Sequence, residues 1–110
     1  MNAAILNAEA LYSSLGDDPD LGELVEMFVV EMPDRISTLI TSFETANWSE
    51  LQRAAHQMKG ASGSYGFDQL TEFAARVENS VKGKAAETEV KEALDELVLV
   101  CGKLRAGTPE

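Results

Sequence analysis

The chain has 110 residues, 45% of them apolar, a composition that fits one folded domain and disfavours a disordered chain. Its 19 acidic and 9 basic side chains give a formal charge of −10. Such a surface repels phosphate backbones and anionic lipids, which disfavours nucleic-acid and membrane partners and leaves a protein partner with a basic or mixed face.

A single cysteine, Cys101, excludes an internal disulfide and is consistent with a reducing compartment. The N-terminal segment lacks the features of a signal peptide, and no segment approaches the ~20 apolar residues of a membrane span. We therefore expect a soluble cytoplasmic protein, either free-standing or part of a longer chain. One domain is expected over residues 1–110, with its core at about residues 6–106.

Apolar residues recur at intervals of three and four, which predicts helices, and alternation by twos is absent, which disfavours a sheet. The first predicted helix is short, covering residues 8–15 with Asn7 as its N-cap. The second follows Asp18, has Pro19 at its first position and runs for about 25 residues. Its apolar face continues in phase past Pro33, so this proline is expected to bend the helix without ending it.

Three more helices follow in chain order. One runs from Trp48 through the segment around His56, the next from Asp68 to a stop near Gly83, and the last from residue 86 to a stop at residue 107. Short connections favour antiparallel neighbours, and each apolar face needs a partner. The sequence therefore predicts an all-α fold, an up-and-down antiparallel four-helix bundle with a short extra N-terminal helix.

The only histidine, His56, lies in the segment AAHQMKGASGSYGF. At about 100° per residue, His56 is roughly 140° from Leu51 and opposite the apolar face, so its imidazole is expected to face solvent. Arg53 and Lys59 lie one turn away, before and after the histidine. No acidic residue occurs between Leu51 and Phe67, and the segment therefore predicts a local positive patch around the imidazole.

Glycines follow the histidine on the same helix. Glycine on an exposed helix face costs about 1 kcal/mol relative to alanine, and Gly60 lies where a longer side chain would lean back over His56. Gly63 follows two turns after the histidine. The segment thus combines an exposed nucleophilic imidazole with nearby cations and a bare surface. Together these features indicate a phosphoryl acceptor onto which a second protein brings its own active site. The alternative is that GASGSYG forms a loop, in which case Gly63 contributes nothing to access.

The segment HQMKG, with Gly66 ten residues after His56, resembles the motif of the histidine-containing phosphotransfer (HPt) domain family. That motif is His, any residue, Leu or Met, Lys and Gly, with a further glycine later. The segment LGDDPDLGELVEMFVVEMPDRISTL looks like the long helix of the family, and the resemblance covers residues 6–104. It implies phosphorylation of His56 on Nε2, neutralisation of the phosphoryl group by Lys59, room for a partner at Gly60, and a turn at Gly66.

The resemblance also implies a phosphorelay intermediate of two-component signalling. Such a protein accepts a phosphoryl group from the phospho-aspartate of a receiver domain, or from a kinase, and passes it to another response regulator. Mg²⁺ would belong to the partner receiver domain, with no cofactor or metal bound by this chain. No nucleotide-binding motif occurs, so we expect a phosphocarrier without an ATP site of its own. Nothing in the sequence demands a dimer, and we expect a monomer. Arg53 and Gln57 lie at positions that the family varies.

Four apolar residues are candidates for partner docking beside the histidine: Leu21, Leu24, Phe28 and Phe67. Cys101 falls on the apolar face of the last helix, which predicts a small buried side chain. A non-catalytic helical adaptor is the main alternative function. A histidine-kinase dimerisation domain fits less well, since Gln57 stands where that family usually has Glu or Asp. A metal protein fits poorly with one histidine and no cysteine cluster.

Overall fold

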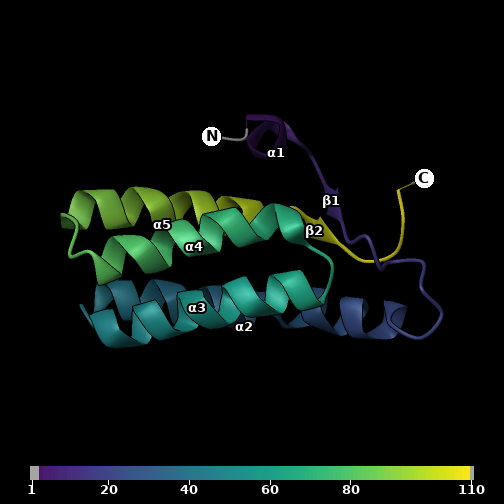
Figure 1. Ribbon diagram of the computed structural model, residues 1–110, viewed down its shortest axis with the longest axis horizontal. Coiled ribbons are helices and arrows are strands. Elements are labelled where there is room, and N and C mark those ends of the chain that lie inside the picture. Colours follow the sequence, from purple (N-terminus) through teal and green to yellow (C-terminus); the bar gives the residue numbers. More distant parts are fainter. Residues whose placement is uncertain (1–2, 110) are drawn as a thin grey trace.

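The computed structural model describes residues 3–109, and most of this chain is helical (Figure 1). The helices are α1 (Ala3–Asn7), α2 (Gly22–Glu44), α3 (Trp48–Ser64), α4 (Asp68–Lys82) and α5 (Glu87–Cys101). Two short strands complete the described part, β1 (Leu11–Tyr12) and β2 (Leu104–Arg105).

The four long helices form an up-and-down bundle, as the sequence predicts. Each of them packs against two others, so that α2, α3, α4 and α5 close a ring in chain order. In Figure 1, α4 and α5 lie side by side above α2 and α3, with the α2–α3 and α4–α5 turns at the same end. The bundle measures 42 × 25 × 18 Å.

The core is built from the apolar faces that the periodicity identifies. Each long helix contributes buried side chains spaced three or four residues apart, which is how one face of a helix meets its neighbours. Four of the largest fully buried side chains are Phe28, Leu51, Phe67 and Leu97. Cys101 is 2% exposed and lies in this core, so the prediction of a buried thiol is confirmed.

Helix α2 runs unbroken through Pro33, in agreement with its uninterrupted apolar face. Its start is three residues later than predicted. Asp18 caps a turn that precedes the helix, where Oδ1 accepts hydrogen bonds from the backbone N–H groups of Asp20 at 2.8 Å and Leu21 at 2.9 Å. The regular helix then begins at Gly22.

The predicted N-terminal helix over residues 8–15 is wrong in position. The short helix is α1, over residues 3–7, and the chain then extends into β1. Here Leu11 pairs with Leu104 and Tyr12 with Arg105 in a parallel two-stranded sheet. These bonds to the far end of the chain override a local helical preference, which a segment of eight residues expresses only weakly.

The last helix also ends earlier than predicted, at Cys101 and not near Gly107. The residues beyond it supply β2, so the expectation that the chain forms no sheet fails at these two short strands. Both corrections have one cause. The two ends of the chain pair with each other, and a helical period in one segment carries no information about a partner about 90 residues away.

The segment before α2 also clamps the turn between α3 and α4. Ser13 Oγ donates a hydrogen bond to the carbonyl oxygen of Tyr65 at 2.5 Å, and the backbone N–H of Ser14 donates to that of Gly66 at 3.0 Å. Gly66 itself has φ +78°, in the left-handed region that favours glycine. The predicted turn at Gly66 is therefore confirmed, and the clamp fixes where α3 ends.

Candidate functional site

His56 lies on the outer face of α3, next to α4. Its side chain is 65% exposed, so the prediction that the imidazole faces solvent is confirmed. The ring lines an open hollow of about 420 Å³ together with Ser49, Gln52, Arg53 and Glu78. Its Nδ1 lies 2.7 Å from Oε2 of Glu78. A partner protein can therefore reach the other ring nitrogen from solvent.

Glu78 is the centre of the polar contacts at this site. Its side chain is only 6% exposed, and Oε1 accepts a hydrogen bond from Lys59 Nζ at 2.7 Å. The hydrogen bond from Lys59 lowers the pKa of the Glu78 carboxyl below its ordinary value of 4.5, and His56 lowers the pKa further, although burial opposes both. The carboxyl is therefore ionised at neutral pH, when it can only accept hydrogen bonds.

This ionised carboxylate determines which nitrogen of His56 carries the proton. Since Glu78 Oε2 can only accept, the contact of 2.7 Å requires Nδ1–H as the donor. In the neutral imidazole the second nitrogen, Nε2, then has a free lone pair. The site consequently presents a nucleophilic nitrogen to solvent and holds the ring by the opposite nitrogen.

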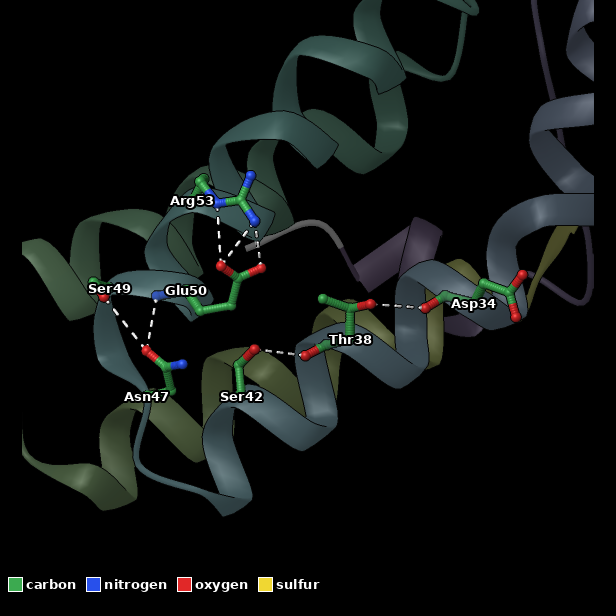
Figure 2. A network of polar contacts seen from close by, with 7 residues as sticks. All are labelled: Asp34, Thr38, Ser42, Asn47, Ser49, Glu50 and Arg53. Carbon is green, nitrogen blue, oxygen red and sulfur yellow. Dashed lines mark hydrogen bonds and ion pairs between the residues drawn. The ribbon is translucent and has the colours of Figure 1, made fainter.

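The predicted positive patch around His56 is wrong as a statement of net charge. Arg53 is bound by Glu50, with contacts of 2.7 to 3.1 Å between the guanidinium and the carboxylate (Figure 2). Lys59 is bound by Glu78. The segment from Leu51 to Phe67 does lack acids, but Glu50 just before it and Glu78 on α4 neutralise both cations.

Glu78 is not among the site residues predicted from the sequence, although the sequence contains a signal for it. In the predicted helix starting at Asp68, Glu78 lies four residues after Ala74 and eight after Leu70, both of which are fully buried. An acidic residue on an apolar helix face is rarely buried without a partner. That position, combined with the antiparallel neighbour that carries the only histidine, indicates a paired carboxylate.

Gly60 and Gly63 lie within helix α3, which continues to Ser64, so the alternative of a loop from Gly60 onward is wrong. A Cβ atom at Gly60 or Gly63 would meet nothing within 4 Å. An alanine at Gly60 would therefore not touch the imidazole, and the effect of a longer side chain on the ring stays a prediction.

The predicted docking residues divide into two groups. Leu21 and Leu24 are exposed, at 37% and 43%, whereas Phe28 and Phe67 are 1% and 0% exposed and cannot serve as surface anchors. The Phe28 ring stacks on Tyr65 and on Phe67, at centroid distances of 4.9 and 5.8 Å. Phe28 lies on the inner face of α2, whereas Phe67 lies in the turn between α3 and α4, where its ring packs against that of Phe28.

Two exposed apolar residues that the sequence analysis missed continue from Leu21 and Leu24 along α2. They are Met27, 56% exposed, and Val30, 71% exposed. Leu24, Met27 and Val30 line one hollow, and we call these three side chains the α2 stripe. Asp20, Glu23, Glu26 and Glu31 line a hollow of about 560 Å³ together with Leu24, Met27 and Val30. The α2 stripe is therefore an apolar surface with an acidic rim.

Within residues 3–109, no helix is long and apolar enough to cross a membrane. Gln57 is exposed on α3 next to His56. The other predicted site residues on α3, together with His56, are Arg53, Gln57, Lys59, Gly60 and Gly63. Gly66 lies at the turn after α3, Leu21 and Leu24 lie at the start of α2, and the two phenylalanines are buried.

Comparison with known proteins gives the family. The chain is 27% identical over 103 residues to the phosphorelay protein LuxU of Vibrio harveyi, and the alignment covers 91% of this chain and 90% of that protein. No solved structure matches the chain. The family model described as Hpt domain matches residues 23–107, which include α2 to α5 and His56. The chain therefore belongs to the Hpt domain family.

Proposed function

We propose that His56 is the residue on which this chain carries a phosphoryl group between the partners of a phosphorelay. Membership of the Hpt domain family and the similarity to a phosphorelay protein make the chain a phosphotransfer intermediate. We further propose that it is a phosphocarrier with no ATP site of its own, located in the cytoplasm. The phosphoryl group then has to come from a partner.

The contact between His56 and Glu78 is the observation that supports this assignment. The carboxylate holds the proton on Nδ1 and leaves the lone pair of Nε2 directed away from the helix pair. A nucleophile positioned by a third group within hydrogen-bond distance is the arrangement that covalent transfer requires. An ordinary surface histidine does not require a bond to a buried carboxylate such as Glu78, whose side chain is 6% exposed.

In the forward step, the Nε2 lone pair attacks the phosphorus of an aspartyl phosphate on the donor. The N–P bond forms as the P–O bond to the aspartyl carboxylate breaks, and the carboxylate leaves with the bonding electrons. The imidazole gains positive charge, which the Glu78 carboxylate stabilises through Nδ1–H. In the reverse direction an aspartate of the next partner attacks the phosphorus, and the N–P electrons return to Nε2.

We propose that Lys59, which is bound to the same carboxylate, assists this transfer. Its ammonium is bound to Glu78 and its side chain is 35% exposed, so the lysine is held close to the ring and remains accessible to an anionic group. A cation at that place stabilises the negative charge of a phosphoryl group attached to His56. Arg53, which is already paired with Glu50, is a weaker candidate for that role.

The proposed partners are receiver domains of response regulators, or a hybrid kinase that contains one. Such a partner would supply the aspartate and the bound Mg²⁺ that screens the transferring oxygens. We propose that it docks in part on the α2 stripe. That surface suits a partner with an apolar centre and basic residues around it, because four carboxylates flank the stripe.

Phosphotransfer to purified protein tests the assignment. Phosphorylated receiver domains and Mg²⁺ are incubated with wild type and with His56→Gln, and the label is followed. Phosphoramidate, a small donor that phosphorylates imidazoles directly, is a second arm that needs no docking. We expect an acid-labile, base-stable label on wild type only. Equal labelling of both proteins, or none from either donor with folding intact, would exclude His56 as the acceptor.

A further inference from the structure

A second groove lies at the end of the bundle where the α2–α3 and α4–α5 turns meet, on the left in Figure 1. It has a volume of about 470 Å³. Its apolar part is formed by Trp48, Val81, Ala85 and Val90, and its polar part by Ser49, Gln52, Lys82, Lys84 and Glu87. Neither the histidine motif nor the α2 stripe includes this groove.

The groove holds the cations that the rest of the bundle leaves unpaired. Within residues 3–109, Lys82 and Lys84 are the basic residues whose side chains have no hydrogen bond, ion pair or ring contact. Both are exposed. Even with the carboxylate of Glu87 at the rim, the charged residues of the groove sum to a positive charge on a chain of net charge −10.

The groove is continuous with the hollow around His56. Ser49 and Gln52 line both, and Lys82 follows Glu78 by one turn of α4. Seven residues of helix separate Ser49 from His56, a rise of about 10 Å. A protein that covers the imidazole with an interface of about 800 Å² therefore reaches the groove as well.

We propose that this groove binds an acidic segment, carrying one apolar side chain, of the partner protein that exchanges its phosphoryl group with His56. The inference rests on the proposed function and specifies how the partner is oriented. Carboxylates of the segment pair with Lys82 and Lys84, and its apolar side chain contacts Trp48 and Val81. The chain carries 19 acidic and 9 basic side chains, so most of its surface repels such a segment and the groove favours one orientation of the partner.

The first test compares charge removal in the groove with charge removal elsewhere. The double variant Lys82→Ala/Lys84→Ala and the control Lys91→Ala/Arg105→Ala lose two positive charges each, and all four side chains are exposed. The donor is the phosphorylated receiver domain that labels wild type fastest. We expect kcat/KM to fall at least tenfold in the groove variant, through KM, and to stay within about twofold of wild type in the control.

Phosphoramidate separates this proposal from the proposed function. Labelling of His56 by the small donor should be unchanged in the groove variant, since no docking is involved. If phosphoramidate does not label wild type, the proposed function fails, whatever the groove does. If the groove variant and the control have the same kcat/KM with the receiver donor, the groove proposal is overturned while the function stands.

Trp48 gives a readout that does not depend on transfer. It is the chain's only tryptophan and lines the groove, so its fluorescence reports occupancy. Titration with the same receiver domain, in a form without tryptophan, should shift the emission of wild type and not of Lys82→Ala/Lys84→Ala. An emission shift that appears on concentrating the protein alone, together with dimers in sedimentation equilibrium, would assign the groove to a second copy and overturn the partner assignment.

Discussion

At the scale of single residues, the chemistry of the site depends on one buried carboxylate. Glu78 contacts the ring nitrogen of His56 and the ammonium of Lys59, each at 2.7 Å. It therefore sets the tautomer of the histidine and the place of the lysine at once. In the proposed transfer Glu78 is a positioning residue, because it would act on the phosphoryl group only through these two side chains.

Replacement of this carboxylate by an amide tests that role. Glu78→Gln keeps the shape but allows the amide to donate to Nδ1, so that both tautomers of His56 become populated. A hydrogen bond to a charged group contributes about 1.5–3 kcal/mol, so phosphotransfer should slow about tenfold or more. Imidazole ¹⁵N shifts of His56 should change with it.

Glu72→Gln, on the exposed side of α4, is the matched control. It should alter neither the rate nor the shifts. An unchanged rate and tautomer in Glu78→Gln would show that the contact only stabilises the helix pair.

The same carboxylate predicts how stability depends on pH. Its pKa is lower in the folded chain than its ordinary value of 4.5, because Lys59 and His56 favour the charged form. Its stabilisation is therefore complete above the unfolded-state pKa and is lost as pH falls through the folded-state pKa. The difference in unfolding free energy between wild type and Glu78→Gln should shrink from pH 5.5 to pH 3, measured by urea denaturation. A difference that grows over this range contradicts the prediction.

At the scale of elements, two glycines of the α3 region have opposite roles. Gly66, at φ +78°, leaves no room for a side chain, since a Cβ would overlap Ser13 Oγ and lie 2.9 Å from Ser14 Oγ. Gly60 lies in the middle of α3, and a Cβ added to it would meet nothing within 4 Å. The first is required by the fold, whereas the second costs helix stability without any packing reason.

Alanine substitution should separate the two. Gly60→Ala should stabilise the protein by about 1 kcal/mol, the ordinary difference in helix propensity. Gly66→Ala should destabilise it by at least about 1–2 kcal/mol for the left-handed backbone alone. Chemical denaturation measures both. A stabilised Gly60→Ala that also transfers more slowly from a receiver donor, with phosphoramidate labelling unchanged, would show that the partner packs on this glycine.

The α2 stripe gives a further prediction at this scale. In Met27→Gln/Val30→Gln, two exposed apolar side chains become polar without a change in charge, and folding should be retained. Loss of an apolar interface contact should raise KM for a receiver donor about tenfold. Leu99→Gln is the control, because Leu99 is 52% exposed on α5 and outside the stripe. Equal KM values in the stripe variant and the control would place docking elsewhere.

At the scale of the whole molecule, the bundle isolates its one thiol. Burial raises the pKa of Cys101 to about 12, from an ordinary value of 9.0. At a given pH near neutrality, the folded chain then holds roughly a thousandth of the thiolate of the unfolded chain. The thiol packs in the core of the bundle, and the folded protein offers an oxidant very little thiolate.

Thiol titration checks this. A disulfide reagent should react with native protein orders of magnitude more slowly than with protein in guanidinium, and only through opening of the bundle. The native rate should therefore track stability, rising in Gly66→Ala and falling in Gly60→Ala. A fast native reaction that is the same in all three proteins would mean that Cys101 is accessible in the folded state.

Local pattern was sufficient for the parts of this protein that repeat with the helical period. The apolar faces predicted the four long helices, their order and their antiparallel packing, and the same geometry placed His56 on the outside. The HQMKG segment and its surroundings were enough to suggest the family, which the match over residues 23–107 confirms. These features depend on residues three or four apart, which sequence spacing reports directly.

Only the tertiary structure decided what depends on residues far apart in the chain. Glu78 meets His56 across 22 residues, β1 meets β2 across more than 90, and Ser13 meets Tyr65 across 52. The neutralised patch, the misplaced first helix and the burial of Phe67 against Phe28 all follow from such contacts. A periodic pattern defines which face of a helix is buried, but which side chain it meets there depends on how the helices are set against one another.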